Sequence, residues 1–164
     1  MHFFEEAEAS DAAVMRAALV HEDTMVASDA MPLTWLGATA DEVWPLPPSA
    51  LTHPAHGGDL RPPFRRLVGE GILGVSEFIR RASQLPAGVL AAASGGAARK
   101  GTLAVGADAD VVVFDPDAFR DRATYEASTQ PSTGVRHLLV GGAPVVRDGA
   151  LVLDARPGRP MRRS

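Results

Sequence analysis

The chain has 164 residues, a formal net charge of −4 and no cysteine. This length supports one ordinary domain with its own core. The acidic balance argues against a nucleic-acid partner, and the lack of cysteine excludes a disulfide framework or thiolate metal site. Because no apolar stretch approaches the roughly 18 residues of a membrane span and the N-terminus lacks signal-peptide order, we expect a cytoplasmic protein without a membrane partner.

The first predicted elements are an amphipathic helix over residues 11–21 and a short strand over residues 24–27. Ser10 is the expected N-cap. Asp29 then follows the strand at the start of a long loop. Barrel enzymes place catalytic groups at this position, whereas the plainer alternative is an aspartate that caps the next turn. The apolar stripe of the predicted helix is Val14, Ala17, Ala18 and His21.

Residues 30–63 are predicted to form a long loop that holds seven of the thirteen prolines. Such loops are usually functional lids or disordered. Trp35 and Trp44 in this loop would either cover a pocket or pack the loop onto the scaffold. The spacing H-x-x-H-x-x-D of His53, His56 and Asp59 leaves two readings open, namely three converging metal ligands or a solvated loop.

Helical stretches are predicted over residues 64–69, 75–84 and 86–93, and Ser94-Gly95-Gly96 marks a domain junction. We therefore divide the chain into residues 1–95 and 96–164. Four strands are predicted in the second section, where Asp148-Gly149 is a strong hairpin signal and Asp108 and Asp110 are read as structural turn residues. These strands are Val111–Phe114, Arg136–Val140, Pro144–Arg147 and Ala150–Leu153.

The stretch Gly101–Asp117, GTLAVGADADVVVFDPD, resembles the signature G-x-L-x-x-G-x-x-A-D-x-V-V-F-D of the small β-sandwich in the amidohydrolase superfamily. DAAVMRAALVHEDTMVASD, residues 11–29, resembles the last helix and strand of the barrel in its N-acyl-D-amino-acid deacylase (D-aminoacylase) branch. His53-Pro54 is similar to the start of the His-Pro-Arg loop that follows in that branch.

This resemblance implies an α/β fold. Residues 1–95 would be the C-terminal part of a (β/α)8 TIM barrel, with 30–63 as its active-site loop, and residues 96–164 would be part of an antiparallel β-sandwich. A complete barrel needs about 250 residues. We therefore expect a fragment or degenerate relative with an open sheet edge and exposed apolar faces.

The resemblance also implies a zinc-dependent hydrolase that cleaves the amide bond of a small-molecule N-acyl-D-amino acid. Asp29 matches the family's aspartate that binds zinc, takes a proton from the metal-bound water and delivers it to the leaving amine. His53 is a candidate for substrate binding. Ala55 stands where the family has its carboxylate-binding arginine, so Arg61 or Arg65 is the candidate replacement.

The metal ligands implied by the resemblance are incomplete in this chain. The family uses an H-x-H pair, a bridging carboxylated lysine, glutamate or cysteine, and two later histidines. This chain has no H-x-H, and its one lysine, Lys100, lies in the predicted sandwich. We expect the chain alone to be inactive and not to retain zinc, with a separate barrel half or a second copy as partner. A cyclic amide or dipeptide substrate, or a non-catalytic binding module, remains an alternative.

Overall fold

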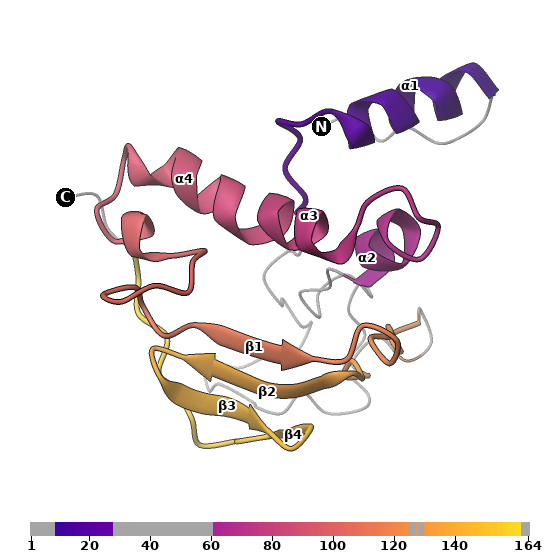
Figure 1. Cartoon of the computed structure of the whole chain (residues 1–164). Coiled ribbons are helices and arrows are strands. Elements are labelled where there is room, and N and C mark those ends of the chain that lie inside the picture. Colours follow the sequence, from indigo (N-terminus) through magenta and orange to yellow (C-terminus); the bar gives the residue numbers. More distant parts are fainter. Residues whose placement is uncertain (1–8, 28–60, 125–126, 128–129, 162–164) are drawn as a thin grey trace, which may run out of the picture.

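The computed structural model describes residues 9–27, 61–124, 127 and 130–161. In these residues, helices lie on one side of a single antiparallel sheet (Figure 1). The helices are α1 (Ala9–Val20), α2 (Arg61–Leu67), α3 (Val75–Ile79), the π-helical turn η2 (Arg80–Gln84), α4 (Leu85–Ala91) and the 3-10 turn η3 (Ala97–Arg99). The strands are β1 (Val111–Phe114), β2 (Val135–Val140), β3 (Ala143–Arg147) and β4 (Ala150–Leu151).

The sheet follows the predicted strands closely. Its order is β1-β2-β3-β4, and each strand pairs antiparallel with the next one along the chain. Asp148 and Gly149 both have positive φ, 51° and 78°, as a two-residue type I′ hairpin turn requires. Gly141 and Gly142 do the same between β2 and β3, with φ of 55° and 83°. Among the described residues, β1 and β4 are the two edge strands of this sheet.

The two helices predicted over 75–84 and 86–93 form one uninterrupted helical run over residues 75–91, because the π-helical turn η2 joins α3 to α4. Pro86, predicted to open a separate helix, therefore lies inside this run, in the first turn of its α4 segment and directly after the π-helical turn. Residues 64–69 are helical only to Leu67, and α2 begins earlier than predicted, at Arg61.

The core of the described residues is centred on Phe64, Leu67 and Phe78. Phe64 is its hub: its ring contacts those of Phe78, Phe114 and Phe119 edge-on, with centroids 5.1, 6.0 and 5.2 Å away. Since Phe114 ends β1 and Phe119 follows it, this aromatic cluster joins the helices to the sheet. The predicted division between residues 95 and 96 stays a prediction, and the two sections share this core.

Three predictions about the N-terminal part are wrong. Residues 24–27 are not a strand: the amide of Val26 donates to the carbonyl of Arg81 at 3.1 Å instead of pairing in a sheet. The helix α1 begins at Ala9, so Ser10 lies inside it. The predicted stripe is exposed, with Val14 at 64%, because the helix turns Leu19 toward the core instead.

The described residues therefore form a mixed α/β arrangement with one sheet. They contain one antiparallel sheet, no parallel strand pair and no second sheet, so the barrel fragment and the β-sandwich stay predictions. Exposed apolar side chains are frequent on both sections, as expected from the sequence. They include Val14 and Val20 on α1, Val89 and Leu90 on α4, and Leu103 and Val105 before β1.

Candidate functional site

Most of the residues predicted to carry chemistry lie outside the described residues. These are Asp29, His53, His56 and Asp59, together with Trp35 and Trp44. The backbone of Arg61 opens α2, and its side chain is likewise outside the described part. Arg65, the second candidate for a carboxylate-binding arginine, is exposed on the same helix. The structure thus shows the flanks of the candidate site, and the role of each predicted residue stays a prediction.

Both flanks of residues 28–60 are attached to the same helical run. On the upstream side, the Val26 amide donates to the Arg81 carbonyl at 3.1 Å. On the downstream side, α2 packs on α3 through Phe64 and Phe78. Val26 itself also packs against this core. The segment that carries Asp29 and His53 therefore starts and ends on one short piece of scaffold, residues 77–81.

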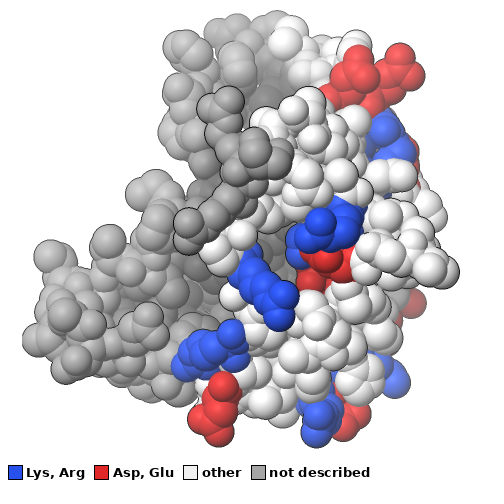
Figure 2. All heavy atoms as spheres, turned by 90° about the vertical axis from the view of Figure 1, so that its left-hand side faces the viewer, with Lys and Arg blue, Asp and Glu red and all other residues white. Residues whose placement is uncertain are grey.

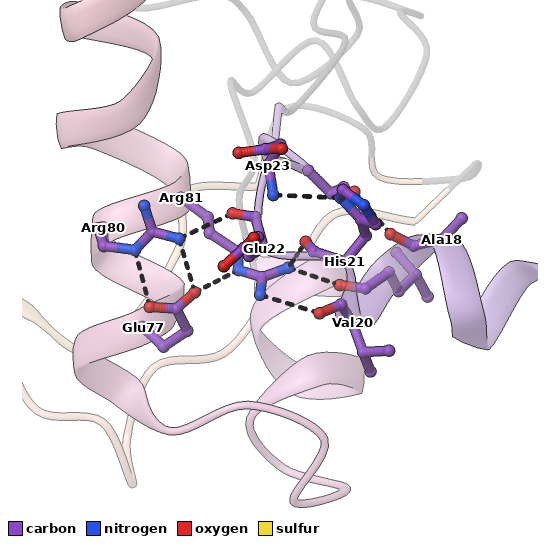
Figure 3. Close-up of polar contacts among 10 residues, drawn as sticks. Ala18, Val20, His21, Glu22, Asp23, Glu77, Arg80 and Arg81 are labelled. Atoms are coloured by element: carbon purple, nitrogen blue, oxygen red, sulfur yellow. Dashed lines mark hydrogen bonds and ion pairs between the residues drawn. The ribbon is translucent and has the colours of Figure 1, made fainter.

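Arg81 is the centre of the upstream attachment. Its side chain is only 4% exposed. Nη1 donates to the carbonyl oxygens of Leu19 and His21 at 2.8 and 2.6 Å, and Nη2 donates to that of Val20 at 3.2 Å (Figure 3). The last carbonyls of a helix lack partners within the helix and attract positive charge. Arg81, about 60 positions further along the chain, supplies both the hydrogen-bond donors and the positive charge to the end of α1.

Glu77 holds two arginines at once. One carboxylate oxygen accepts from Arg81 Nε at 2.6 Å, and the other accepts from Arg80 Nε at 2.8 Å. Arg80 also donates from Nη2 to the Glu22 carbonyl at 2.8 Å. Hydrogen bonds from Arg80 and then Arg81 lower the pKa of Glu77 from 4.5 to about 2. Glu77 is therefore a carboxylate at neutral pH, and one that orients guanidinium groups instead of exchanging protons.

A second ion cluster lies at the entry to the sheet. Lys100 donates to Asp110 and lies 3.0 Å from Asp108, which also accepts from Arg99 Nε at 3.0 Å. Asp110 in turn accepts from the Gly141 amide at 2.7 Å. The hydrogen bonds from Lys100 are the main reason that the pKa of each aspartate is lowered. The same bonds, first that to Asp110 and then that to Asp108, raise the pKa of Lys100. Both aspartates make structural contacts of the kind predicted: Asp110 joins the start of β1 to the turn after β2, whereas Asp108 pairs with Arg99 and Lys100 ahead of β1.

The described residues contain no group of three or more histidine, aspartate or glutamate side chains that could hold a metal ion. His21 follows α1, is exposed, and accepts a hydrogen bond from the Asp23 amide at 3.3 Å. His137 lies in β2, with its Nε2 3.8 Å from Asp148. The two histidines lie in different sections of the fold, one in the helical part and one in the sheet.

The surface of the described residues carries both signs of charge. On the face in Figure 2, Lys and Arg side chains lie close to Asp and Glu side chains in several places, and uncharged surface lies between these places. A hollow of about 390 Å³ opens among residues 102–111. It is lined mainly by apolar side chains, together with Thr102 and with Asp108, which is paired with Lys100. No helix in the described ranges is long and apolar enough to cross a membrane.

Sequence reasoning missed the cluster formed by Glu77, Arg80 and Arg81. Its signal was available, because Glu77 precedes the two arginines by three and four positions, the spacing that places side chains together on a helix. That spacing alone predicts a solvent-exposed pair. Only the fold shows that Arg81 is buried against the end of α1.

The sequence model of the amidohydrolase family matches residues 10–146. An N-acyl-D-glutamate deacylase of Alcaligenes xylosoxydans xylosoxydans is 37% identical over 94% of this chain. Among solved structures, a D-aminoacylase described as defining a novel subset of amidohydrolases aligns with a TM-score of 0.68 and 25% identity over 95% of the chain. Another D-aminoacylase, studied for its binuclear metal centre, has a TM-score of 0.58 and 27% identity over 68%.

The chain spans 28% of the length of the N-acyl-D-glutamate deacylase and 28% of the first of these solved D-aminoacylases. It aligns with 22% of the second. These relatives are therefore more than three times as long as the chain, and the likeness covers one part of each.

Proposed function

The chain belongs to the amidohydrolase family, and from this premise we propose that it is the C-terminal portion of a metal-dependent amidohydrolase that cleaves the amide bond of N-acyl-D-amino acids. One observation carries the proposal: the 37% identity to an N-acyl-D-glutamate deacylase extends over 94% of the chain, from the helical section into the sheet. The likeness in fold to two D-aminoacylases supports the same substrate class.

Asp29 is the residue that we propose to carry the chemistry. A carboxylate in this position would take a proton from the attacking water and return it to the leaving amine, as general base and then general acid. His53 and Arg61 are the proposed contacts to the substrate, and a guanidinium at position 61 would suit its carboxylate. The hydrogen bonds from Arg80 and Arg81 to the carbonyl groups of residues 19–22 (Figure 3), together with the bond from the Val26 amide to the Arg81 carbonyl, support a fixed approach of the chain toward Asp29.

The metal does not fit the described residues taken alone. A catalytic zinc site needs about three protein ligands, and no such group is found in the described ranges. Asp29 would supply one ligand, and the others would come from elsewhere in a complete barrel. We therefore propose that zinc is bound only in the complete enzyme, that the chain alone is inactive, and that its partner is a barrel half or a second copy.

The first experiment measures the zinc content of the purified chain and its turnover of a panel of N-acetyl-D-amino acids that includes N-acetyl-D-glutamate. We expect neither stoichiometric zinc nor turnover. The chain is then joined to the upstream part of the N-acyl-D-glutamate deacylase, in place of the matching section. This chimera is expected to bind zinc and to turn over the panel.

In the chimera, Asp29→Asn is expected to lower kcat by about 10²–10⁴-fold. Asp23→Asn is the matched control: it makes the same change six positions upstream and should leave kcat unchanged. Near-normal turnover of Asp29→Asn would refute the role of Asp29. Zinc and turnover in the chain alone would show that the site is complete without a barrel half. Turnover confined to cyclic amides or dipeptides would favour the alternative specificity.

A further inference from the structure

We propose that Arg81, held by Glu77, is a positioning residue that fixes the path of residues 19–27 and thereby the direction in which the chain runs toward Asp29. The contacts themselves are independent of any activity. Their link to catalysis rests on the proposed function, because Asp29 is the residue proposed to move the proton.

The first step of the argument is that Arg81 binds the chain on both sides of one turn. Its guanidinium holds the end of α1 through the carbonyl groups of Leu19, Val20 and His21. Its own carbonyl accepts the Val26 amide. A residue that only capped α1 would need the first set of contacts and not the second. Arg81 therefore fixes the direction in which the chain leaves the helix.

The turn between these two attachments is closed by its own hydrogen bonds. The Thr24 hydroxyl donates to the Ala18 carbonyl at 2.6 Å, and the Thr24 amide donates to that of His21 at 3.1 Å. Arg80, which is not part of this turn, also donates a hydrogen bond to the Glu22 carbonyl. With the ends and the middle of the turn all held, little freedom is left to the backbone before Ala27, two positions before Asp29.

The chemistry of the contacts requires arginine at position 81. A guanidinium presents five donors in a rigid planar fork, whereas an ammonium is a point charge on a flexible stem. Arg81 uses three nitrogens to reach three backbone carbonyls and Glu77. Lysine keeps the charge and cannot make this set. Arg81→Lys therefore removes the positioning geometry while it leaves a cation at the end of α1.

The experiment measures the position of the backbone at Ala27 directly. Because the chain has no cysteine, two spin labels can be introduced without other changes. One pair, Ala27→Cys with Val89→Cys, joins the approach to Asp29 with the exposed face of α4. A second pair, Val112→Cys with Val89→Cys, joins the edge strand β1 with the same helix and reports on the rest of the fold.

Double electron–electron resonance is expected to give a narrow distance distribution for both pairs in the parent chain. Arg81→Lys is expected to broaden the 27–89 distribution and to leave the 89–112 distribution unchanged. Arg99→Lys is the matched control, since it makes the same change in an arginine that pairs with Asp108 at the sheet, and neither distribution should change.

An unchanged 27–89 distribution in folded Arg81→Lys would overturn the proposal. Equal broadening of both pairs would also overturn it, because Arg81 would then only stabilise the fold. If Arg81→Lys does not fold, Glu77→Gln decides in its place: it keeps the shape of residue 77 and removes the charge that holds Arg81, and it is expected to broaden the 27–89 pair alone.

The measurement involves no turnover, so its failure leaves the role of Asp29 untouched. Asp29→Asn, in turn, is expected to leave both distance distributions unchanged while it lowers the kcat of the chimera. The two proposals can therefore fail separately.

Discussion

The sheet and the helical section are held together over very different separations along the chain. Each strand of the sheet pairs with its neighbour in sequence, and the two tight turns need only residues with positive φ. In the helical section, Arg81 reaches carbonyl groups about 60 positions away. Strands β2 to β4 can therefore assemble from local information, whereas β1 pairs with β2 across the longer segment 115–134. The region next to the candidate site depends on a few side chains that meet only in the folded chain.

The two regions meet at Phe64, so removing its side chain tests whether the helices and the sheet depend on each other for their stability. Phe64 is buried and touches aromatic rings from α3, β1 and the segment after β1. We expect Phe64→Ala to lower the free energy of unfolding by about 3–5 kcal/mol, from lost burial and the cavity that remains. Chemical denaturation followed by circular dichroism measures this value.

The control for Phe64 is Leu103→Ala, which removes a large apolar side chain that is 82% exposed. It should change the unfolding free energy by no more than about 0.5 kcal/mol. A loss below about 1 kcal/mol for Phe64→Ala would mean that the helices and the sheet are stable without the shared cluster, and that they form two separate cores.

Gly101 tests the second contact between the regions. Its φ is +72°, and a Cβ there would lie 2.8 Å from Gln84 Cα and 2.9 Å from the Ser83 carbonyl oxygen. Gly101→Ala combines backbone strain with a clash against the π-helical turn, so we expect a loss of about 3 kcal/mol. Thermal unfolding measures the effect.

Gly106 separates the two causes, because its φ is +86° and a Cβ there would meet nothing within 4 Å. Gly106→Ala should therefore show the backbone strain alone, about 1 kcal/mol. Equal losses for the two variants would show that the helical run moves aside for the extra methyl group, and that the contact at Gly101 is not tight.

The difference in how far apart contacting residues lie along the chain also explains which features could be predicted from the sequence. Val111–Phe114 and the Asp148-Gly149 turn were recognisable because strand and hairpin signals lie within a few residues of one another. Residues 24–27 have the composition of a strand, yet a strand exists only beside a partner, and here Val26 pairs with Arg81. The burial of Arg81 was equally invisible, since it depends on the end of α1.

For the candidate site, the sequence supplied the family and the residue proposed for the chemistry, Asp29. Both came from resemblance over a long stretch, and the family is confirmed by the match over residues 10–146. What resemblance could not supply was the support around the site. The roles of Glu77 and Arg80 follow from distances between side chains and carbonyl groups of another helix, which no spacing in the sequence states.

The smallest expected effect is seen in an acid titration, in which the NMR signals of one amide from each region are compared. The pKa of Glu77 is lowered from 4.5 to about 2 by the two arginines. Because the folded value is below the unfolded one, the stabilisation by Glu77 is complete above pH 4.5 and is lost as the pH falls through about 2. In that window, the NMR signal of the Val26 amide should shift as residues 19–26 loosen from Arg81.

Glu77→Gln should abolish the pH dependence of this shift, because its side chain does not titrate. The Gly141 amide, which donates to Asp110 at 2.7 Å, is the control in the sheet and should respond the same way in parent and variant. A Val26 signal with the same pH dependence in both proteins would show that Glu77 does not govern how the chain is held before Asp29.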